Sequence, residues 1–291
     1  MFDIEYYHIK GALFMDETTR LRKKAIELRK DLILMIHDAK TGHIGGSLSS
    51  LDILTALFYG VLHFDAKNPK WPGRDRFVLS KGHSVEGYYN ILGDLGFFPK
   101  EELKSFCQFK SRFIGHPSVK VPGVEINTGA LGHGLSVATG MALAGKVDGL
   151  DYRVFVLMGD GELDEGSVWE GAMAASNYGL DNLVGIVDRN RLQISGDTEK
   201  VMRLERLSGK WAEFGWVVEE VDGHDISRLL ELFRSAPFKT GKPSLILANT
   251  VKGKDVSFME NTAKWHHGVP TDEQMATAFS ELDQRIKELA I

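Results

Sequence analysis

Apolar residues recur at helical spacing near the start of the chain. Positions 21, 25, 28, 32, 35 and 36 are apolar, which predicts an amphipathic helix over Leu21–Ile36. Thr18 or Thr19 is the expected cap of this helix. A glycine-rich loop over Thr41–Ser47 and an apolar helix near Leu48–Leu62 are expected next.

Four short apolar runs have the character of buried strands, because continuous apolar runs are typical of strands covered on both faces. The runs are Arg76–Leu79, Arg153–Met158, Leu183–Val187 and Ser244–Ala248. Helical segments over Leu131–Ala144 and Val168–Tyr178 separate the first three of them. The alternation predicts an α/β fold of three layers, a largely parallel sheet with helices on both faces.

The chain is expected to form a single domain over residues 1–291. The sequence contains no repeat, low-complexity tract or obvious linker. Its 291 residues and 43% hydrophobic content fit one domain with a sizeable core. A charged surface helix over Asp272–Leu289 is expected near the end.

Charge and hydropathy exclude several classes of protein. The net charge of −5 gives no sign of a nucleic-acid-binding surface. The chain has no run of 18 or more apolar residues, so no membrane helix is predicted. Its acidic, aromatic start, with Asp3, Glu5, Tyr6 and Tyr7, lacks the pattern of a signal peptide. A single cysteine, Cys107, fits a reducing compartment, so we expect a cytoplasmic protein with a packed thiol.

Glycines and oxygen donors follow two of the predicted strands. Gly159-Asp160-Gly161 ends one strand, and Asn190, which follows that triplet after 28 intervening residues, ends another. Ligands of open parallel sheets bind beside such strand ends, and glycines let the backbone approach a phosphate. Carboxylate and amide oxygens suit Mg²⁺ or Ca²⁺. We therefore predict a diphosphate and metal site here, although Gly-Asp-Gly alone also fits an ordinary turn.

Four histidines lie in loops that contain glycine, namely His43, His83, His116 and His267. Imidazoles can bind diphosphate oxygens or sugar hydroxyls and can transfer protons near neutral pH. One loop histidine taken alone also fits a surface or packing role. Four in similar settings favour a clustered polar site.

The stretch VFVLMGDGELDEGSVWEGAMAASNYGLDNLVGIVDRNRLQISGDT closely resembles the thiamine-diphosphate fingerprint of the transketolase family. The resemblance implies the thiamine-diphosphate-binding fold known as the PP domain. It also implies thiamine diphosphate and Mg²⁺ as cofactors, with Ca²⁺ or Mn²⁺ as substitutes. Asp160 and Asn190 would be metal ligands through their side chains, and Leu192 through its carbonyl. Gly159, Gly161 and Asn190 would bind the cofactor.

The four histidine loops resemble segments of the same family. His43 matches the histidine of SGHPG, His83 that of LSxGH, His116 that of GHPE, and His267 that of a late HG pair. By this resemblance all four are catalytic residues, and His83 and His267 also bind the cofactor. His266 is a neighbour whose role is left open.

Some loop positions depart from the family pattern. Ile44 stands where the family has proline, and Ser47-Leu48-Ser49 stands for PLG, which bears on the shape of the His43 loop and on donor contacts. Ser118 replaces the acidic residue of GHPE.

The segment Thr128-Gly-Ala-Leu-Gly-His-Gly resembles the family's TGPLGQG, which contacts the aminopyrimidine side of the cofactor. Gly129 and Leu131 keep this backbone role in the resemblance and would bind the cofactor. His133 replaces glutamine, and its role is left open.

The resemblance covers only the first domain of a full-length transketolase. The chain stops at Ile291, and the pyrimidine domain that supplies the family's activating glutamate does not follow. We therefore expect a split enzyme, in which the partner is a C-terminal transketolase subunit and two copies of each chain assemble. Glu165 matches a glutamate thought to link the two sites across the interface; capping of the next helix is its alternative.

The expected reaction is reversible transfer of a two-carbon ketol unit from a ketose to an aldose. The enzyme would be a transferase of aldehyde or ketone residues, acting on sugar phosphates as in the pentose phosphate pathway, or on branched or sulfonated sugars. Alternatives are the α subunit of a 2-oxo-acid dehydrogenase, a deoxyxylulose-phosphate synthase, and a non-catalytic cofactor-binding paralogue. The His43, His83 and His116 loops argue against the first alternative.

Overall fold

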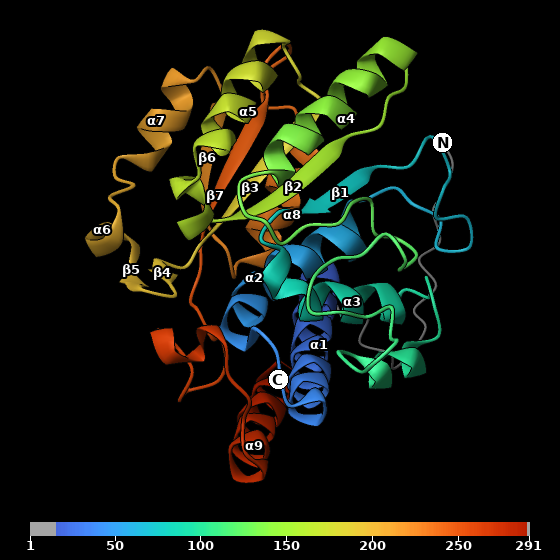
Figure 1. The fold of residues 1–291 in the computed structure, drawn as a ribbon, viewed down its shortest axis with the longest axis vertical. Helices are drawn as coiled ribbons and strands as arrows, with labels where there is room; N and C mark the ends of the chain where they lie inside the picture. Colours follow the sequence, from blue (N-terminus) through green and yellow to red (C-terminus); the bar gives the residue numbers. More distant parts are fainter. Residues whose placement is uncertain (1–15, 290–291) are drawn as a thin grey trace, which may run out of the picture.

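A computed structural model describes residues 16–289 of the chain. The acidic, aromatic stretch at residues 3–7 and both ends of the expected domain lie outside these residues. Five parallel strands form one sheet in the order β1-β2-β3-β7-β6 (Figure 1). The strands are β1 Arg76–Leu79, β2 Val154–Gly159, β3 Leu183–Arg189, β6 Val217–Asp222 and β7 Ser244–Asn249.

The four predicted strands are confirmed, and β6 is an additional strand. β6 carries Glu219, Glu220 and Asp222 and lies at the edge of the sheet, where only Val221 is buried. An edge strand keeps polar side chains in solvent, so it lacks the continuous apolar run of the central strands. The apolar pattern therefore does not reveal it.

Helices cover both faces of the sheet, as the predicted three-layer fold requires (Figure 1). Side chains alternate along each strand: Phe155 and Leu157 of β2 pack on one layer, and Val154, Val156 and Met158 on the other. The first layer comprises α1 Glu17–Ala39, α2 Ile44–Gly60, α3 Val85–Asp94 and α8 Ile226–Ser235. The second comprises α4 Gly134–Asp148, α5 Gly166–Asn177 and α7 Leu207–Glu213.

Short elements connect these layers. The ribbon of β4 Leu192–Gln193 and β5 Gly196–Asp197 is antiparallel, and α6 Thr198–Val201 follows it. The 3₁₀ helices are η1 Gly82–Ser84, η2 Lys100–Ser105, η3 Gly161–Asp164 and η4 Ala263–His266.

The predicted starts of the first two helices are wrong. Asp16, and neither threonine, caps α1, because its Oδ1 accepts a hydrogen bond from the Thr19 N–H at 3.1 Å. α2 begins at Ile44, so most of the expected glycine-rich loop is helical. A Cβ on Gly45 would lie 2.5 Å from the Trp265 carbonyl oxygen, so this glycine allows close packing of the helix.

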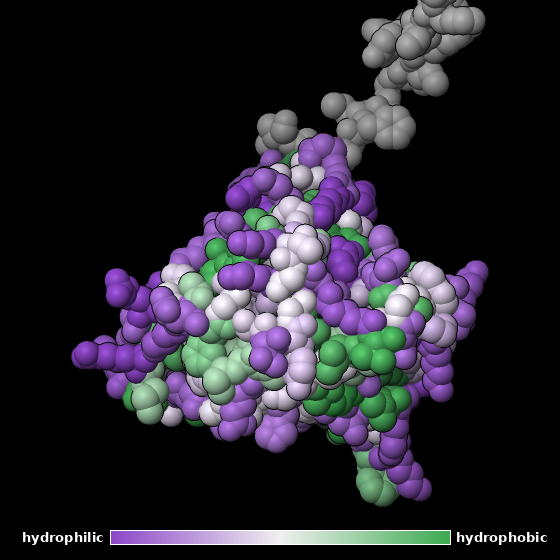
Figure 2. Space-filling model, turned by 90° about the horizontal axis from the view of Figure 1, so that it is seen from above, coloured by the Kyte–Doolittle hydropathy of each residue, from purple (hydrophilic) through white to green (hydrophobic). Residues whose placement is uncertain are grey.

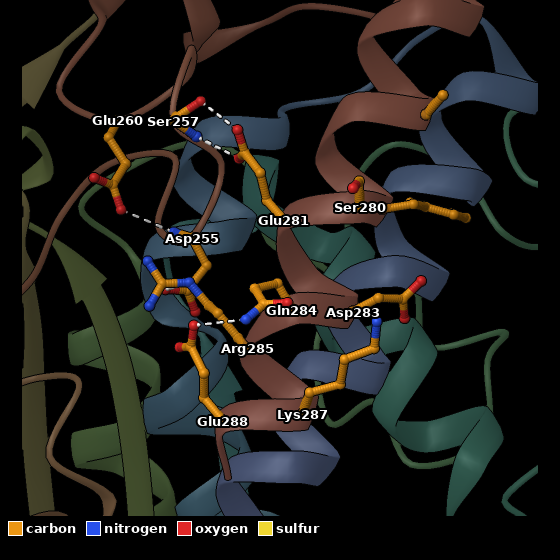
Figure 3. A pocket seen from close by; sticks show the side chains of 12 residues that line it. Asp255, Ser257, Glu260, Ser280, Glu281, Asp283, Gln284, Arg285, Lys287 and Glu288 are labelled. Carbon is orange, nitrogen blue, oxygen red and sulfur yellow. Dashed lines mark hydrogen bonds and ion pairs between the residues drawn. The ribbon is translucent and has the colours of Figure 1, made fainter.

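α9, Asp272–Glu288, matches the expected terminal helix and buries Ala278 and Leu282 against the first layer. Figure 3 shows the hollow between α9 and the segment 255–260. Glu281 accepts hydrogen bonds from the N–H and hydroxyl of Ser257, at 2.9 and 2.5 Å. Arg285 pairs with Asp255 at 3.2 Å. These contacts across the hollow hold α9 against the segment 255–260. Within residues 16–289, no helix combines the length and apolar character needed to cross a bilayer.

The expectation of a packed Cys107 thiol is wrong, because this residue is exposed. Its backbone has a left-handed φ of 56°, and its N–H donates to the Phe113 carbonyl at 2.8 Å. The neighbouring rings of Phe106 and Phe113 are buried in its place. The turn thus uses its aromatic side chains, and not its thiol, to fill the core.

Candidate active site

A cavity of about 410 Å³ lies at the carboxyl ends of β1, β2 and β3. Ten of the twelve residues predicted from sequence line it, and only His116 and His267 are outside its lining. The ten are His43, His83, Gly129, Leu131, Gly159, Asp160, Gly161, Glu165, Asn190 and Leu192. Sequence segments far apart in the chain therefore meet at the predicted edge of the sheet.

The four predicted histidines form one cluster around the His43 ring. The ring centroid of His43 lies 5.3 Å from that of His83, 6.2 Å from that of His116 and 4.8 Å from that of His267. His266 joins them, at 5.7 Å from His43 and 5.2 Å from His83. The predicted clustering of histidine side chains is thus present, although His116 and His267 lie outside the lining of the cavity.

Burial favours the neutral form of the His43, His83 and His116 rings. It lowers the pKa of His43 to about 4, with His267 and His116 adding to the effect, and that of His83 to about 2, with Lys81 adding to the effect. Burial also lowers the pKa of His116. Neutral imidazoles can each donate one hydrogen bond and accept another, which suits contacts with sugar hydroxyls.

The predicted metal ligands lie side by side after β2 and β3. The Asp160 carboxylate accepts from the N–H groups of Gly161 and Arg191, at 2.8 and 2.5 Å. The Asn190 side-chain oxygen accepts from the Leu192 N–H at 3.1 Å. Burial and the nearby Asp188 raise the pKa of Asp160 to about 6, so a cation beside this carboxylate would be stabilised.

These oxygen donors fit a hard cation. In the part of the chain that the structure describes, no three His, Cys, Asp or Glu side chains are grouped to hold a metal. A cation would therefore depend on one carboxylate, the Asn190 amide and the Leu192 carbonyl, completed by oxygens of an anion. A cation that keeps few protein ligands and shares phosphate oxygens is typical of Mg²⁺ sites.

A buried ion pair beneath the cavity escaped the sequence prediction. The Lys81 ammonium, directly before η1, contacts the Asp188 carboxylate of β3, and both side chains are buried. Ser49 and Thr250 also donate hydrogen bonds to Asp188. Burial alone would raise the pKa of Asp188, but Lys81 and these hydrogen bonds lower it. Lys81 directly precedes the Gly82-His83 pair that was recognised in the sequence. This position was the signal that could have identified Lys81 as a site residue.

Lys252 is a second buried ammonium at the cavity. Its Nζ lies 2.9 Å from the Leu192 carbonyl oxygen and 2.9 Å from Nδ1 of His266. Burial, with Lys81 adding to the effect, lowers the pKa of Lys252 to about 8. His266 lines the cavity and His267 does not, so the structure favours His266 as the ring nearer to a cofactor.

Glu162 ties together three loops of the site. Its carboxylate accepts hydrogen bonds from the Ser80 hydroxyl, the Gly132 N–H at 3.0 Å and the Gly159 N–H at 3.1 Å. The side chain is buried, and burial raises its pKa. Glu162 lies inside the fingerprint recognised in the sequence, but the sequence does not show which loops its carboxylate joins. These three hydrogen bonds become apparent only in the folded structure.

Two glycines of the predicted set are needed for close packing. A Cβ on Gly129, whose φ is +138°, would lie 2.5 Å from Cδ2 of His116. A Cβ on Gly161 would lie 2.9 Å from Cβ of Gln193. Both glycines line the cavity, and a side chain at either position would displace its neighbour.

Glu165 is exposed at the N-cap position of α5, and its side chain makes no capping hydrogen bond. The alternative, in which Glu165 caps α5, therefore lacks the hydrogen bond that it requires. His133 is exposed as well, and its Nδ1 lies 3.2 Å from the Leu131 carbonyl oxygen.

Comparison with known proteins agrees with this site. The profile of the family "transketolase, thiamine diphosphate binding domain" matches residues 22–283. The chain is 52% identical over 261 residues to one of the subunits of the apulose-4-phosphate transketolase of Phocaeicola vulgatus, covering 90% of this chain and 93% of that one. It is 40% identical over 265 residues to the 6-deoxy-6-sulfo-D-fructose transketolase subunit SqwG of a Clostridium species, covering 91% and 96% of the two chains.

A solved structure shows the same fold. Transketolase from Campylobacter jejuni matches with a TM-score of 0.84 and 33% identity, over 91% of this chain and 43% of that chain. The fold and the cavity thus define an α/β domain that binds thiamine diphosphate. The chain belongs to the transketolase family. The predicted fold, family and enzyme class are thereby confirmed.

Proposed function

We propose that the cavity binds thiamine diphosphate with Mg²⁺, or with Ca²⁺ or Mn²⁺ in its place. Asp160, Asn190 and the Leu192 carbonyl would hold the cation, and the backbone of Gly159 and Gly161, which line the cavity, would approach the diphosphate. The observation that carries this proposal is the grouping of these oxygen donors in one cavity with two buried ammonium groups. When bound, thiamine diphosphate supplies the carbon nucleophile of ketol transfer.

The clustered histidines would then act on the sugar. His43, His83, His116 and His267 are proposed to bind hydroxyls of the donor and to hold or move protons there, and His83 and His267 also to contact the cofactor. His266, which lines the cavity where His267 does not, is the alternative to His267 for the cofactor contact. The lowered pKa values of His43, His83 and His116 support this role, because a neutral ring has both a donor and an acceptor nitrogen. Gly129 and Leu131 would contact the cofactor through their backbone atoms.

We further propose that a partner subunit carrying a pyrimidine domain completes the site, in an assembly with two copies of each chain. The word "subunit" in the names of the two relatives supports a partner. Such a partner would cover the open side of the cavity, where Ile194 of the lining is an exposed apolar side chain. Figure 2, which views the molecule from above, shows hydrophobic beside hydrophilic surface. Glu165 also lines the cavity and is exposed, so a partner that completes the site would cover it.

The substrates are proposed to be sugar phosphates, and apulose 4-phosphate is the first compound to test because of the 52% identical relative. A sulfonated sugar and the pentose phosphates are the next candidates. The domain is taken to span residues 1–291, and we place it in the cytoplasm because its sequence has a single cysteine.

The test is co-purification with the candidate partner, followed by assay of ketol transfer with and without thiamine diphosphate and Mg²⁺. We expect transfer by the complex and none by this chain alone. Asp160→Ala should abolish Mg²⁺-dependent cofactor binding, whereas Asp151→Ala, an exposed change before β2, should leave it unchanged. Transfer at full rate by the isolated chain would refute the split assembly.

The same assays separate the alternatives. Pyruvate decarboxylation without ketol transfer would indicate a 2-oxo-acid dehydrogenase subunit. Binding of thiamine diphosphate without turnover, even in the presence of the partner, would indicate a non-catalytic paralogue. Ketol transfer is favoured, because the His43, His83 and His116 rings are brought together.

A further inference from the structure

A buried carboxyl group lies directly behind the histidine cluster. Glu86 is in the first turn of α3, and its side chain is fully buried. Its Oε1 accepts a hydrogen bond from the backbone N–H of His43 at 2.7 Å, and its Oε2 accepts one from the Ser47 hydroxyl at 2.6 Å. Within residues 16–289, no basic side chain forms an ion pair with it.

Such a group is destabilising unless its hydrogen bonds are made. Burial raises the pKa of Glu86, and the bonds from Ser47 and His43 offset part of this effect. The stability of the core does not require a carboxyl group here, since an apolar side chain avoids the desolvation penalty. The two hydrogen bonds of Glu86 therefore indicate that its role is to hold the segment that contains His43 and Ser47.

That loop carries the centre of the histidine cluster. His43 is the N-cap residue of α2 and makes no capping bond with its own side chain. A parallel bridge to Gly268 holds its backbone on one side, and Glu86 holds its N–H on the other. Gly42 permits this approach, because a Cβ there would lie 2.8 Å from Oε1 of Glu86.

We propose that Glu86 is a positioning residue that fixes the backbone of His43, and through it the direction of the His43 ring within the cavity. The Ser47 hydroxyl is the second anchor of the same carboxyl group. Ser47 is one of the positions where this chain departs from the family's PLG segment, so the Glu86–Ser47 contact explains that departure as part of the anchor. The inference rests on the proposed function, in which His43 contacts the donor sugar.

Three substitutions separate the hydrogen bonds from the charge. In Glu86→Gln, Oε1 can still accept from His43, and the amide nitrogen can donate to Ser47. Glu86→Leu removes both bonds at similar volume. Ser47→Ala removes only the Ser47 bond and leaves the His43 bond in place.

The first measurement is steady-state kinetics of the complete enzyme with its partner. Displacement of a catalytic group by about 1 Å can lower the rate about 100-fold, so we expect kcat to fall about 10- to 100-fold in Glu86→Leu. We expect a fall of about threefold in Ser47→Ala and less than threefold in Glu86→Gln, with the Kd for thiamine diphosphate within about threefold throughout. A loss in Glu86→Gln equal to that in Glu86→Leu would overturn the proposal, since charge would then be the cause.

The second measurement uses this chain alone and does not depend on activity. We expect hydrogen exchange at the His43 amide to be about tenfold faster or more in Glu86→Leu, and unchanged in Glu86→Gln. Equal rates in wild type and Glu86→Leu would overturn the positioning role. If Glu86→Leu does not fold, Ser47→Ala decides the question, and unchanged kcat would refute the anchor. Absence of ketol transfer in the wild-type complex would refute the function, while the exchange data would still test Glu86.

Discussion

The ammonium of Lys81 and the carboxylate of Asp188 form a buried ion pair that spans the middle strand of three. Lys81 follows β1, Asp188 lies in β3, and β2 runs between those strands. The Lys81 Nζ also donates to the Gly46 carbonyl at 2.9 Å, and Ser49 donates to Asp188 at 2.6 Å, so the pair holds α2 as well. The Lys81–Asp188 ion pair therefore joins the residues at the base of the cavity to the sheet and to α2.

Removal of one member of this pair should be strongly destabilising. We expect Lys81→Met and Asp188→Asn each to lower the free energy of unfolding by about 3 to 5 kcal/mol, since each leaves a buried group without its partner. The double variant should lose less than the sum of the two single losses. Urea unfolding of the isolated chain measures all three. Lys100→Met, which breaks the partly exposed pairs of Lys100 with Asp31 and Asp94, is the control and should lose at most about 1 kcal/mol. Additive losses would contradict the coupling.

Acid should destabilise the chain through the histidine cluster. The unfolded pKa of histidine is about 6.5, whereas burial lowers that of folded His43 to about 4. Between these values the unfolded chain binds protons that the folded chain excludes, so stability falls as the pH falls. With allowance for partial exposure, His43→Gln should reduce the loss between pH 7 and pH 5 by about 1 to 2 kcal/mol. His133→Gln, at an exposed ring, is the control for this titration. The same acid sensitivity in wild type and His43→Gln would refute the assignment.

A methyl group at Gly129 should disturb His116. Its φ of +138° and the 2.5 Å approach to the His116 ring predict strain and displacement in Gly129→Ala. We expect a loss of about 2 kcal/mol in stability, together with weaker binding of thiamine diphosphate in calorimetry. Gly140→Ala is the matched control, because no atom lies within 4 Å of its added Cβ in α4. That control should be stabilised by about 0.5 to 1 kcal/mol. Equal effects in both variants would argue against the close approach.

The exposed thiol of Cys107 should react in the folded chain. We expect one equivalent of a thiol reagent such as Ellman's reagent to be consumed without denaturant, at a rate below that of a free thiol because burial raises the Cys107 pKa. Cys107→Ser should change the free energy of unfolding by less than about 0.5 kcal/mol. Reaction only after unfolding would restore the packed thiol that the sequence suggested.

The sequence predicted the parts of the fold that are buried on both sides. β2, β3 and β7 are continuous apolar runs because helices cover both of their faces, and glycine at the end of β2 marks the turn into the site. β6 was missed because edge strands need no such run. Cys107 was misplaced because one left-handed backbone angle decides which side chains of that turn face the core.

The sequence predicted the motif residues of the site more fully than the buried charged residues that support them. Motif positions located His43 and Asp160, since their loops carry glycine and follow or precede regular elements. Lys252 and Glu86 were missed, because a charged residue between apolar neighbours is ordinary in any sequence. Only their complete burial in the folded chain distinguishes them. The choice between His266 and His267 likewise depended on the direction of adjacent side chains.

The walls of the cavity come from segments that begin at His43 and end at His266. No fragment shorter than this span can contain the whole lining, so its assembly is coupled to folding of the span from His43 to His266. A ligand that binds only the assembled site therefore raises the melting temperature of the whole domain, by an amount set by its concentration relative to its Kd. Thermal shift in the isolated chain is thus a direct assay for cofactors and cations, before any partner or substrate is known.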